Sequence, residues 1–215
     1  QELFHCDLQV IHKFSTDDIN YLKKIKSNKK DLKLISFHLA SCYENPLIKK
    51  GVFHPQGIKL SIKEMKLNAI ENIKQIKNIF GDKIHVSVEN NNGYNTEAYD
   101  YVTDPDFISS IVNDNDINFL FDISHAKITA INTGVNYDLY LSKLPLNRIN
   151  QIHISKEGFN STGEVFDAHE LPSYKETKEI LEFVKKYKTL KYITVEYYKD
   201  PLKLVDYLIK LKNII

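Results

Sequence analysis

Hydrophobic residues recur along the chain in two alternating patterns, one typical of helices and one typical of short buried strands. Residues 61–80 begin with Ser61 and Glu64 at the spacing of a capping box, and they continue with apolar side chains at helical period. The same signals predict further helices, each beginning after a residue that commonly caps a helix: Ser15, Asp104, Ser173 and Asp200.

Between these helices lie short runs rich in Ile, Val, Phe and Tyr, which predict strands over residues 33–38, 84–89, 117–122, 149–154 and 192–197, with residues 2–5 as the end of another. Strand and helix alternate with no block of successive strands, which favours a parallel sheet with crossover helices. No Rossmann or Walker glycine motif follows a strand, so a barrel is favoured over a doubly wound sheet. We therefore expect one TIM-barrel-like (β/α) domain over residues 1–215, short of one or two βα units, and an N-terminal unit could be missing.

Composition narrows the class of protein. The net charge is +1, and 28 of the 29 basic residues are lysine, with Arg148 as the single arginine, so a nucleic-acid partner is disfavoured, although it is not excluded. No apolar run reaches the length of a membrane span, and because the first residues show no signal-peptide pattern, none is expected. Cys6 and Cys42 form no CxxC pair, which predicts reduced thiols in a cytoplasmic protein. Because a short barrel exposes sheet edges, a homodimer is also expected.

Acidic and imidazole side chains fall at or near the carboxyl ends of the predicted strands, at intervals of 31 to 51 residues: His5, His38, Glu89, Asp122, His153 and Glu196. In a barrel these strand ends converge on one face, where active sites are built. One histidine at a strand end is more often a satisfied polar residue than a ligand. Six strand ends in phase are much harder to obtain by chance, so the pattern predicts a shared site.

Two short motifs add to this set. Asp122-Ile-Ser-His125 places an imidazole one turn after a strand carboxylate, and Asp167-Ala-His169 is predicted to lie in a loop. Five histidines and four carboxylates so close together must bind metal or share protons. Mixed ligation of this kind suits zinc, iron or manganese rather than calcium. Of the remaining histidines, His85 is interpreted as structural, His12 as surface and His54 as a weak candidate for a substrate contact.

Several of these segments resemble a known family. The runs Phe121–Gly134 (FDISHAKITAINTG) and Tyr140–His153 (YLSKLPLNRINQIH) are similar to the multinuclear non-heme iron oxidative enzymes, the family of the methanobactin-biosynthesis oxidase, and Val88-Glu89-Asn90 with Tyr94 looks like the glutamate segment of that family. The resemblance covers roughly residues 84–200. The chain departs from the family in having His125 where an asparagine is common, and in lacking a second histidine after His153.

His125 is also similar to a position in endonuclease IV, which shares the xylose-isomerase-like barrel. By that resemblance Glu89 bridges two ions, and His5 with His38 holds one ion. The resemblance assigns a second ion to Asp122, His153 and Glu196, and a third to His125, Asp167 and His169. Glu89, Glu196 and His125 are the catalytic candidates, while Asn90, Asn132 and Tyr94 are the candidate substrate contacts.

Four functions follow from these resemblances and residues. The leading hypothesis is an oxidase with two or three metal ions, for which iron is the metal we expect and zinc or manganese the alternatives, acting on a peptide or small-molecule substrate. The second is an endonuclease IV-like phosphodiesterase on abasic DNA, in which clustered metals activate water. The third is a sugar isomerase or epimerase, with Glu89 and Glu196 as acid and base. A non-catalytic metal-binding module is the remaining option.

Overall fold

Six strands of the chain assemble into one curled parallel sheet, seen in the computed structural model, which describes residues 1–161 and 163–215. Within those residues the sheet has six strands in the order β1-β2-β5-β6-β7-β10, and every neighbouring pair is parallel. The strands are β1 (Leu3–Gln9), β2 (Leu34–Leu39), β5 (His85–Asn90), β6 (Asn118–Asp122), β7 (Ile149–Ile154) and β10 (Tyr192–Val195).

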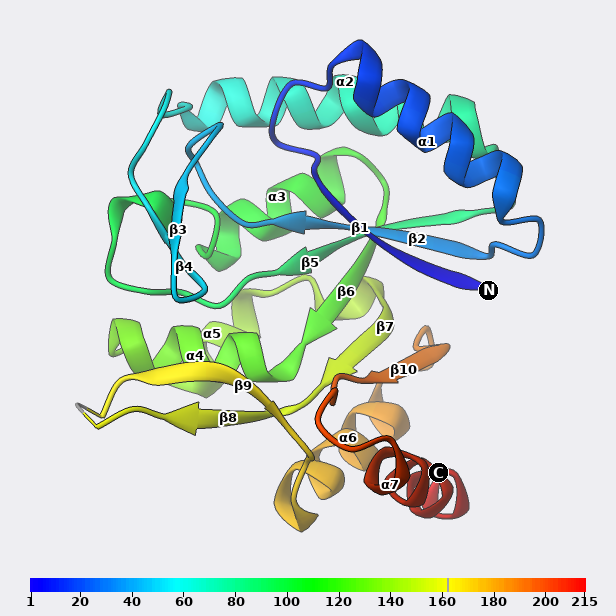
Figure 1. Cartoon of the computed structure of the whole chain (residues 1–215), viewed down its shortest axis with the longest axis vertical. Coiled ribbons are helices and arrows are strands. Elements are labelled where there is room, and N and C mark those ends of the chain that lie inside the picture. The colour runs from blue at the N-terminus through cyan, green and yellow to red at the C-terminus, as the bar shows by residue number, and fades with distance from the viewer. Residues whose placement is uncertain (162) are drawn as a thin grey trace.

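The order of the strands across this sheet is also their order along the chain, so the chain winds in one direction as in a TIM barrel. A complete barrel has eight such strands. The six strands found in the described residues leave β1 and β10 as edges, and the sheet is a partial barrel (Figure 1). The expected α/β TIM-barrel-like fold, short of one or two units, is confirmed.

Five helices begin where their capping residues predict: α1 (Thr16–Asn28), α2 (Ile62–Phe80), α3 (Pro105–Asp114), α6 (Tyr174–Lys186) and α7 (Pro201–Ile214). The sequence did not predict α4 (Ile123–Thr133) or α5 (Tyr137–Lys143). In α4 seven of eleven side chains are buried, so it lacks the polar face that gives a surface helix its period. Two short 3₁₀ turns, η1 (Glu97–Tyr99) and η2 (Leu146–Arg148), complete the helical elements.

The cap of α2 gives a direct test of helix stability. Ser61 accepts a hydrogen bond from the Glu64 backbone N–H, and the Glu64 carboxylate accepts one from the Ser61 backbone N–H. We expect Ser61→Ala to lower the free energy of unfolding by about 1 kcal/mol, the usual cost of losing such a cap. Urea unfolding measures this change, and an unaltered midpoint would contradict the role given to the cap.

Two antiparallel hairpins interrupt the alternation of strand and helix. One is β3 (Leu47–Lys49) with β4 (Val52–His54), and the other is β8 (Lys156–Phe159) with β9 (Val165–Glu170). In Figure 1 both lie on the side towards which β2 and β5 point. The expectation of no successive strands was therefore wrong, because β7, β8 and β9 follow one another. Asp167 and His169 also lie on a strand, β9, rather than in a loop.

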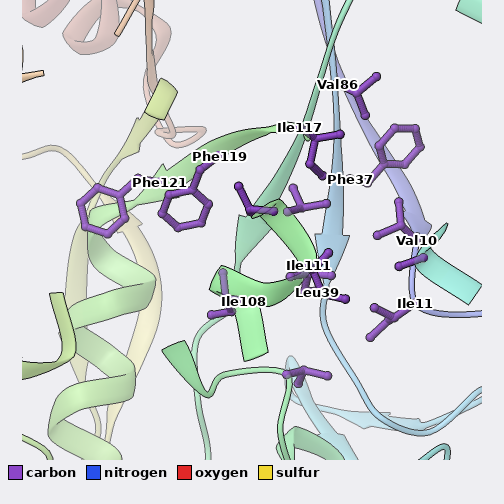
Figure 2. Packing of buried hydrophobic residues seen from close by; sticks show 14 of the residues in the cluster. Val10, Ile11, Phe37, Leu39, Val86, Ile108, Ile111, Ile117, Phe119 and Phe121 are labelled. Carbon is purple, nitrogen blue, oxygen red and sulfur yellow. The ribbon is translucent and has the colours of Figure 1, made fainter. Parts of the chain in front are cut away.

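The core packs between the sheet and the helices on its outer side. Figure 2 shows part of this cluster, with side chains from the β1–α1 connection, β2, α3 and β6 among those labelled: Val10, Ile11, Phe37, Leu39, Ile108, Ile111, Phe119 and Phe121. Phe121 also meets Phe183 of α6, with ring centroids 5.2 Å apart. Among the helices of the described residues, none is long and apolar enough to cross a membrane.

Candidate metal centre

The parallel strands bring their polar residues together at one end of the sheet. His38 pairs in register with Glu89, and Asp122 with His153, while Glu196 follows β10 directly. His5 lies in the middle of β1, because that strand runs to Gln9 and not only over residues 2–5. The first turn of α4 adds His125, and the hairpin strand β9 adds Asp167 and His169. All nine residues expected from the sequence therefore lie at one site.

Glu89 lies at the centre of this cluster, and its side chain is 2% exposed. Its Oε2 is 3.1 Å from His5 Nε2 and 3.1 Å from His38 Nδ1, and its Oε1 is 2.9 Å from His153 Nδ1. Burial disfavours the ionised carboxylate, but the imidazoles of His5 and His153 outweigh burial and hold the pKa of Glu89 well below its usual value. Glu89 is therefore an anion with three imidazole nitrogens around it.

Asp122 caps α4 with one oxygen and offers the other to the site. Its Oδ1 accepts a hydrogen bond of 2.7 Å from the His125 backbone N–H. Its Oδ2 is buried and has no hydrogen-bond partner among the described residues. Burial raises the pKa of Asp122 to about 7. A buried carboxylate oxygen without a donor is costly unless a cation lies beside it, so this atom fits a metal ligand.

Two histidines are each fixed by a hydrogen bond on one ring nitrogen, while the other nitrogen faces a carboxylate of the cluster. His125 Nδ1 donates to the Asn90 carbonyl at 2.9 Å, and its Nε2 points to Asp167 Oδ2 at 3.3 Å. His5 Nδ1 lies 2.8 Å from Ser36 Oγ, and its Nε2 faces Glu89. An imidazole held on one nitrogen with the other directed inwards is the usual arrangement around protein-bound metals.

The β8–β9 hairpin and Glu196 close the site from the other side. Glu196 lies between two imidazoles, with Oε1 3.2 Å from His153 Nδ1 and Oε2 3.4 Å from His169 Nε2. His169 Nε2 is also 3.0 Å from Asp167 Oδ2. The backbone of His169 has φ of 45°, in the left-handed region that residues with a side chain rarely adopt. Strain of this kind concentrates at functional sites.

Ligand atoms of the nine residues form four groups in which all atoms lie within 4.8 Å of one another, namely His5/His38/Glu89, Glu89/Asp122/His125, Asp122/His153/Glu196 and Asp167/His169/Glu196. The first and third match the sets implied by the resemblance to endonuclease IV. The third implied set, His125 with Asp167 and His169, is divided in the structure. Asp167 and His169 lie with Glu196, and His125 lies with Glu89 and Asp122. The mixed imidazole and carboxylate donors, together with an Asp122 oxygen that has no hydrogen-bond partner among the described residues, fit the binding of metal ions.

A cavity of about 880 Å³ opens above the cluster. Its outer walls come from the two hairpins, with Leu47, Ile48 and Phe53 on one side and Phe166 on the other, and Tyr94 also lines it. Leu47, Ile48 and Phe166 are each more than a third exposed. The cavity therefore combines a floor of ligand-type residues with walls that carry both apolar side chains and polar ones, such as Glu44, Lys50 and Gln56.

Asn90 and Asn132 are not among the residues that line this cavity. The Asn90 side chain is fully buried and joins β5 to β6, donating to the Asp122 carbonyl and accepting from the Asp122 N–H, both at 2.9 Å. Asn132 donates to the carbonyls of Gly93 and Val165, and so links α4 to β9. The geometry therefore gives both asparagines positions behind the site rather than facing a substrate.

This placement of Asn90 predicts a loss of stability on substitution. In Asn90→Ala the buried N–H and C=O of Asp122 lose their side-chain partners, so we expect the free energy of unfolding to fall by about 1–3 kcal/mol. Chemical denaturation of the metal-free protein measures the change, with the exposed Asn113→Ala as the control. Unchanged stability together with weaker substrate binding would favour the role expected from the sequence.

The three other histidines lie outside the cluster. His12, interpreted as surface from the sequence, is half-buried, and its Nε2 lies 2.8 Å from the Ser41 carbonyl oxygen. His54 ends β4 and does not line the cavity, while His85 begins β5 with Nε2 3.3 Å from Lys191 Nζ.

Sequence reasoning missed polar residues directly behind the ligands, above all Ser36 behind His5 and Gln151 behind His153. Both lie two positions before a histidine on a buried strand. A polar residue on the same face as a ligand was the signal that could have found them.

Comparison with known proteins assigns the chain to a family. The model of a family described as the RiPP precursor modification enzyme MbnB/TglH/ChrH matches residues 11–208. A UPF0276 protein of Acaryochloris marina is 28% identical over 103 residues, which are 47% of this chain and 36% of that protein.

Among solved structures, an L-ribulose 3-epimerase superposes with a TM-score of 0.51 at 13% identity, over 93% of this chain and 62% of that one. A D-psicose 3-epimerase in the presence of D-fructose gives a TM-score of 0.56 at 14% identity, over 89% and 61%. The chain thus spans about a third of the curated relative and about three fifths of these structures. At such identities the structures show a shared TIM-barrel fold and nothing further.

Proposed function

Because the chain belongs to the MbnB/TglH/ChrH family of RiPP precursor modification enzymes, we propose that it is an iron-dependent oxidase that modifies a peptide. The observation that carries the proposal is the cluster of nine ligand-type side chains, seven of which line the cavity, while Asp122 Oδ2 is buried with no hydrogen-bond donor among the described residues. Five imidazoles and four carboxylates supply enough ligands for two or three ions and leave room for a substrate atom.

Iron ions bound by these residues would supply the redox chemistry that consumes dioxygen. The protein groups hold and orient the reacting parts. Glu89 joins the histidines of three strands and is almost fully buried, so it sets the geometry of the cluster. Glu196 and His125 line the cavity, so both are placed to contact a bound substrate as well as a metal ion.

A peptide suits the size of the cavity and the mixture of apolar and polar side chains in its walls. The cavity has a volume of about 880 Å³, towards the upper end of the range for small-molecule sites, roughly 300–1,000 Å³. Its walls present exposed apolar residues from two hairpins, among them Ile48 at 60% exposure. A peptide can place one side chain at the ligands while its neighbouring apolar side chains cover these walls. Of the three substrate contacts expected from the sequence, Tyr94 is the one that lines the cavity, and we propose that it contacts the peptide.

The proposal is tested with iron-loaded protein, dioxygen and a library of synthetic cysteine-containing peptides. We expect dioxygen uptake that depends on peptide, together with a change in peptide mass, and we expect Glu196→Gln to lose both while it still folds. Zinc-loaded protein serves as the redox-inactive control. Absence of uptake and of any mass change, with nicking of abasic DNA or epimerisation of a ketose instead, would overturn the oxidase in favour of a hydrolase or a sugar enzyme.

A further inference from the structure

Gln151 lies directly behind His153, on the side of the imidazole that faces away from the carboxylates. The two residues are separated by one position on β7, so their side chains lie on the same face of the strand. Gln151 is 3% exposed, and its Nε2 is 3.0 Å from both His153 Nε2 and Thr194 Oγ1. Its Oε1 is buried and has no hydrogen-bond partner in the described part of the chain.

In this arrangement the Gln151 amide donates to His153 Nε2, so Nε2 must carry a lone pair. The proton of a neutral imidazole then resides on Nδ1, which lies 2.9 Å from Glu89 Oε1 and 3.2 Å from Glu196 Oε1. Despite these short distances Nδ1 has no partner in hydrogen-bonding geometry among the described residues. A nitrogen that carries a proton also cannot bind a metal ion, so this tautomer leaves His153 unable to serve as a ligand.

A half-turn of the Gln151 carboxamide gives its buried Oε1 a hydrogen-bond donor and also frees His153 Nδ1 of its proton. The two ends of the amide have nearly the same size, so the turn brings Oε1 to the position between His153 and Thr194 without displacing either. There Oε1 accepts from His153 Nε2–H and from the Thr194 hydroxyl. His153 Nδ1 then presents its lone pair towards the carboxylates of Glu89, Asp122 and Glu196, the last two of which share a ligand group with His153.

We propose that Gln151 is a positioning residue that selects the metal-binding tautomer of His153 by accepting a hydrogen bond from Nε2. The inference rests on the proposed metal-dependent function, but it concerns the binding of metal alone. The Asn90 carbonyl accepts a hydrogen bond from His125 Nδ1 in the same way, at 2.9 Å, and Nε2 of that ring is left to face Asp167. Gln151 thus gives His153 the same backing, although its amide must turn to provide it.

Two substitutions separate the acceptor from the volume of the side chain. Gln151→Leu removes the acceptor at similar size, and Gln151→Glu keeps an acceptor that has no donor end. Zinc is titrated calorimetrically into metal-free protein, and the histidine ¹⁵N shifts of the zinc-loaded protein report the protonated nitrogen of His153. We expect Gln151→Leu to weaken one zinc site about 10–100-fold, the usual effect of removing such a partner. Gln151→Glu should bind zinc at least as tightly as the wild type.

The control is Gln75→Leu, a half-buried glutamine on α2, which should leave zinc binding unchanged. Equal zinc affinity for Gln151→Leu and the wild type would overturn the proposal, as would a zinc-loaded wild type in which His153 Nε2 carries no proton. If Gln151→Leu does not fold, Gln151→Glu decides, because weaker binding than the wild type would overturn it. Wild-type protein that binds no zinc would instead contradict the metal site and the proposed function with it.

Discussion

Substitution of Glu89 by glutamine is expected to remove at least one metal ion per chain and to abolish the activity that depends on it. Glu89 is within 3.1 Å of imidazole nitrogens from β1, β2 and β7, so no other carboxylate can replace it without moving a strand. Glutamine keeps the shape of the side chain but removes the negative charge and turns one oxygen into an N–H donor. Losing a partner behind a ligand already costs about 10–100-fold in affinity, so losing this central carboxylate should cost at least as much.

Metal content by mass spectrometry and calorimetric titration measure this effect. Glu71→Gln is the matched control, because Glu71 is an exposed carboxylate on α2 and belongs to none of the ligand-type groups. It should bind the same number of ions as the wild type. Wild-type stoichiometry and affinity in Glu89→Gln would show that Glu89 does not hold metal.

Removal of the bound metal is expected to lower the melting temperature by a large amount. A ligand present at 1,000 times its dissociation constant stabilises the folded state by about 4 kcal/mol. For a chain of this size about 1 kcal/mol corresponds to about 2–4 °C, so each ion removed should lower the melting temperature by roughly 8–16 °C. The physical reason lies in the cluster itself, since the buried Asp122 Oδ2 has no hydrogen-bond donor among the described residues and loses a compensating charge once the cation is gone.

Thermal unfolding with and without a chelator, at constant pH and ionic strength, measures this change. Readdition of the metal should restore the original melting temperature. Ser61→Ala provides a reference, because the loss of its helix cap should lower the melting temperature by a similar amount whether or not metal is bound. A chelator effect of the same size in Glu89→Gln and in the wild type would place the stabilising metal elsewhere.

The sequence predicted the parallel part of the fold because each strand carries a strong local signal. Strands β2 and β7 are short runs of almost entirely buried residues, and a capping residue precedes each predicted helix. Ligand-type residues then followed from topology, since a residue at a strand end must lie at the carboxyl face of the sheet. Hydrophobic periodicity and helix caps were therefore sufficient to predict the parallel sheet with its helices and the candidate ligands on the strands.

The hairpins and α4 escaped prediction for physical reasons. The β8–β9 strands pair with each other rather than with the sheet, and their exposed and half-buried residues show no clear alternation. The position of His169 depends on a left-handed backbone that no sequence pattern announces. Helix α4 is buried on most of its surface, so its apolar residues show no helical period.

The residues behind the ligands were the other part that sequence alone did not reveal. Asn90 could be read as a substrate contact because it adjoins Glu89, but its amide is directed to Asp122 on the neighbouring strand. Gln151 and Ser36 act across similar short distances. Such contacts depend on which atom of a side chain faces which neighbour, and that is fixed only when the strands are packed.

The central claim is that this cluster holds metal, and the metal content of the protein tests it most directly. Protein purified without oxygen should be analysed by mass spectrometry for bound metals, together with its visible spectrum. We expect two or three ions per chain, with iron and a charge-transfer band as the result that also supports the oxidase. Protein that binds none of iron, zinc or manganese, and that keeps its melting temperature in chelator, would contradict the claim.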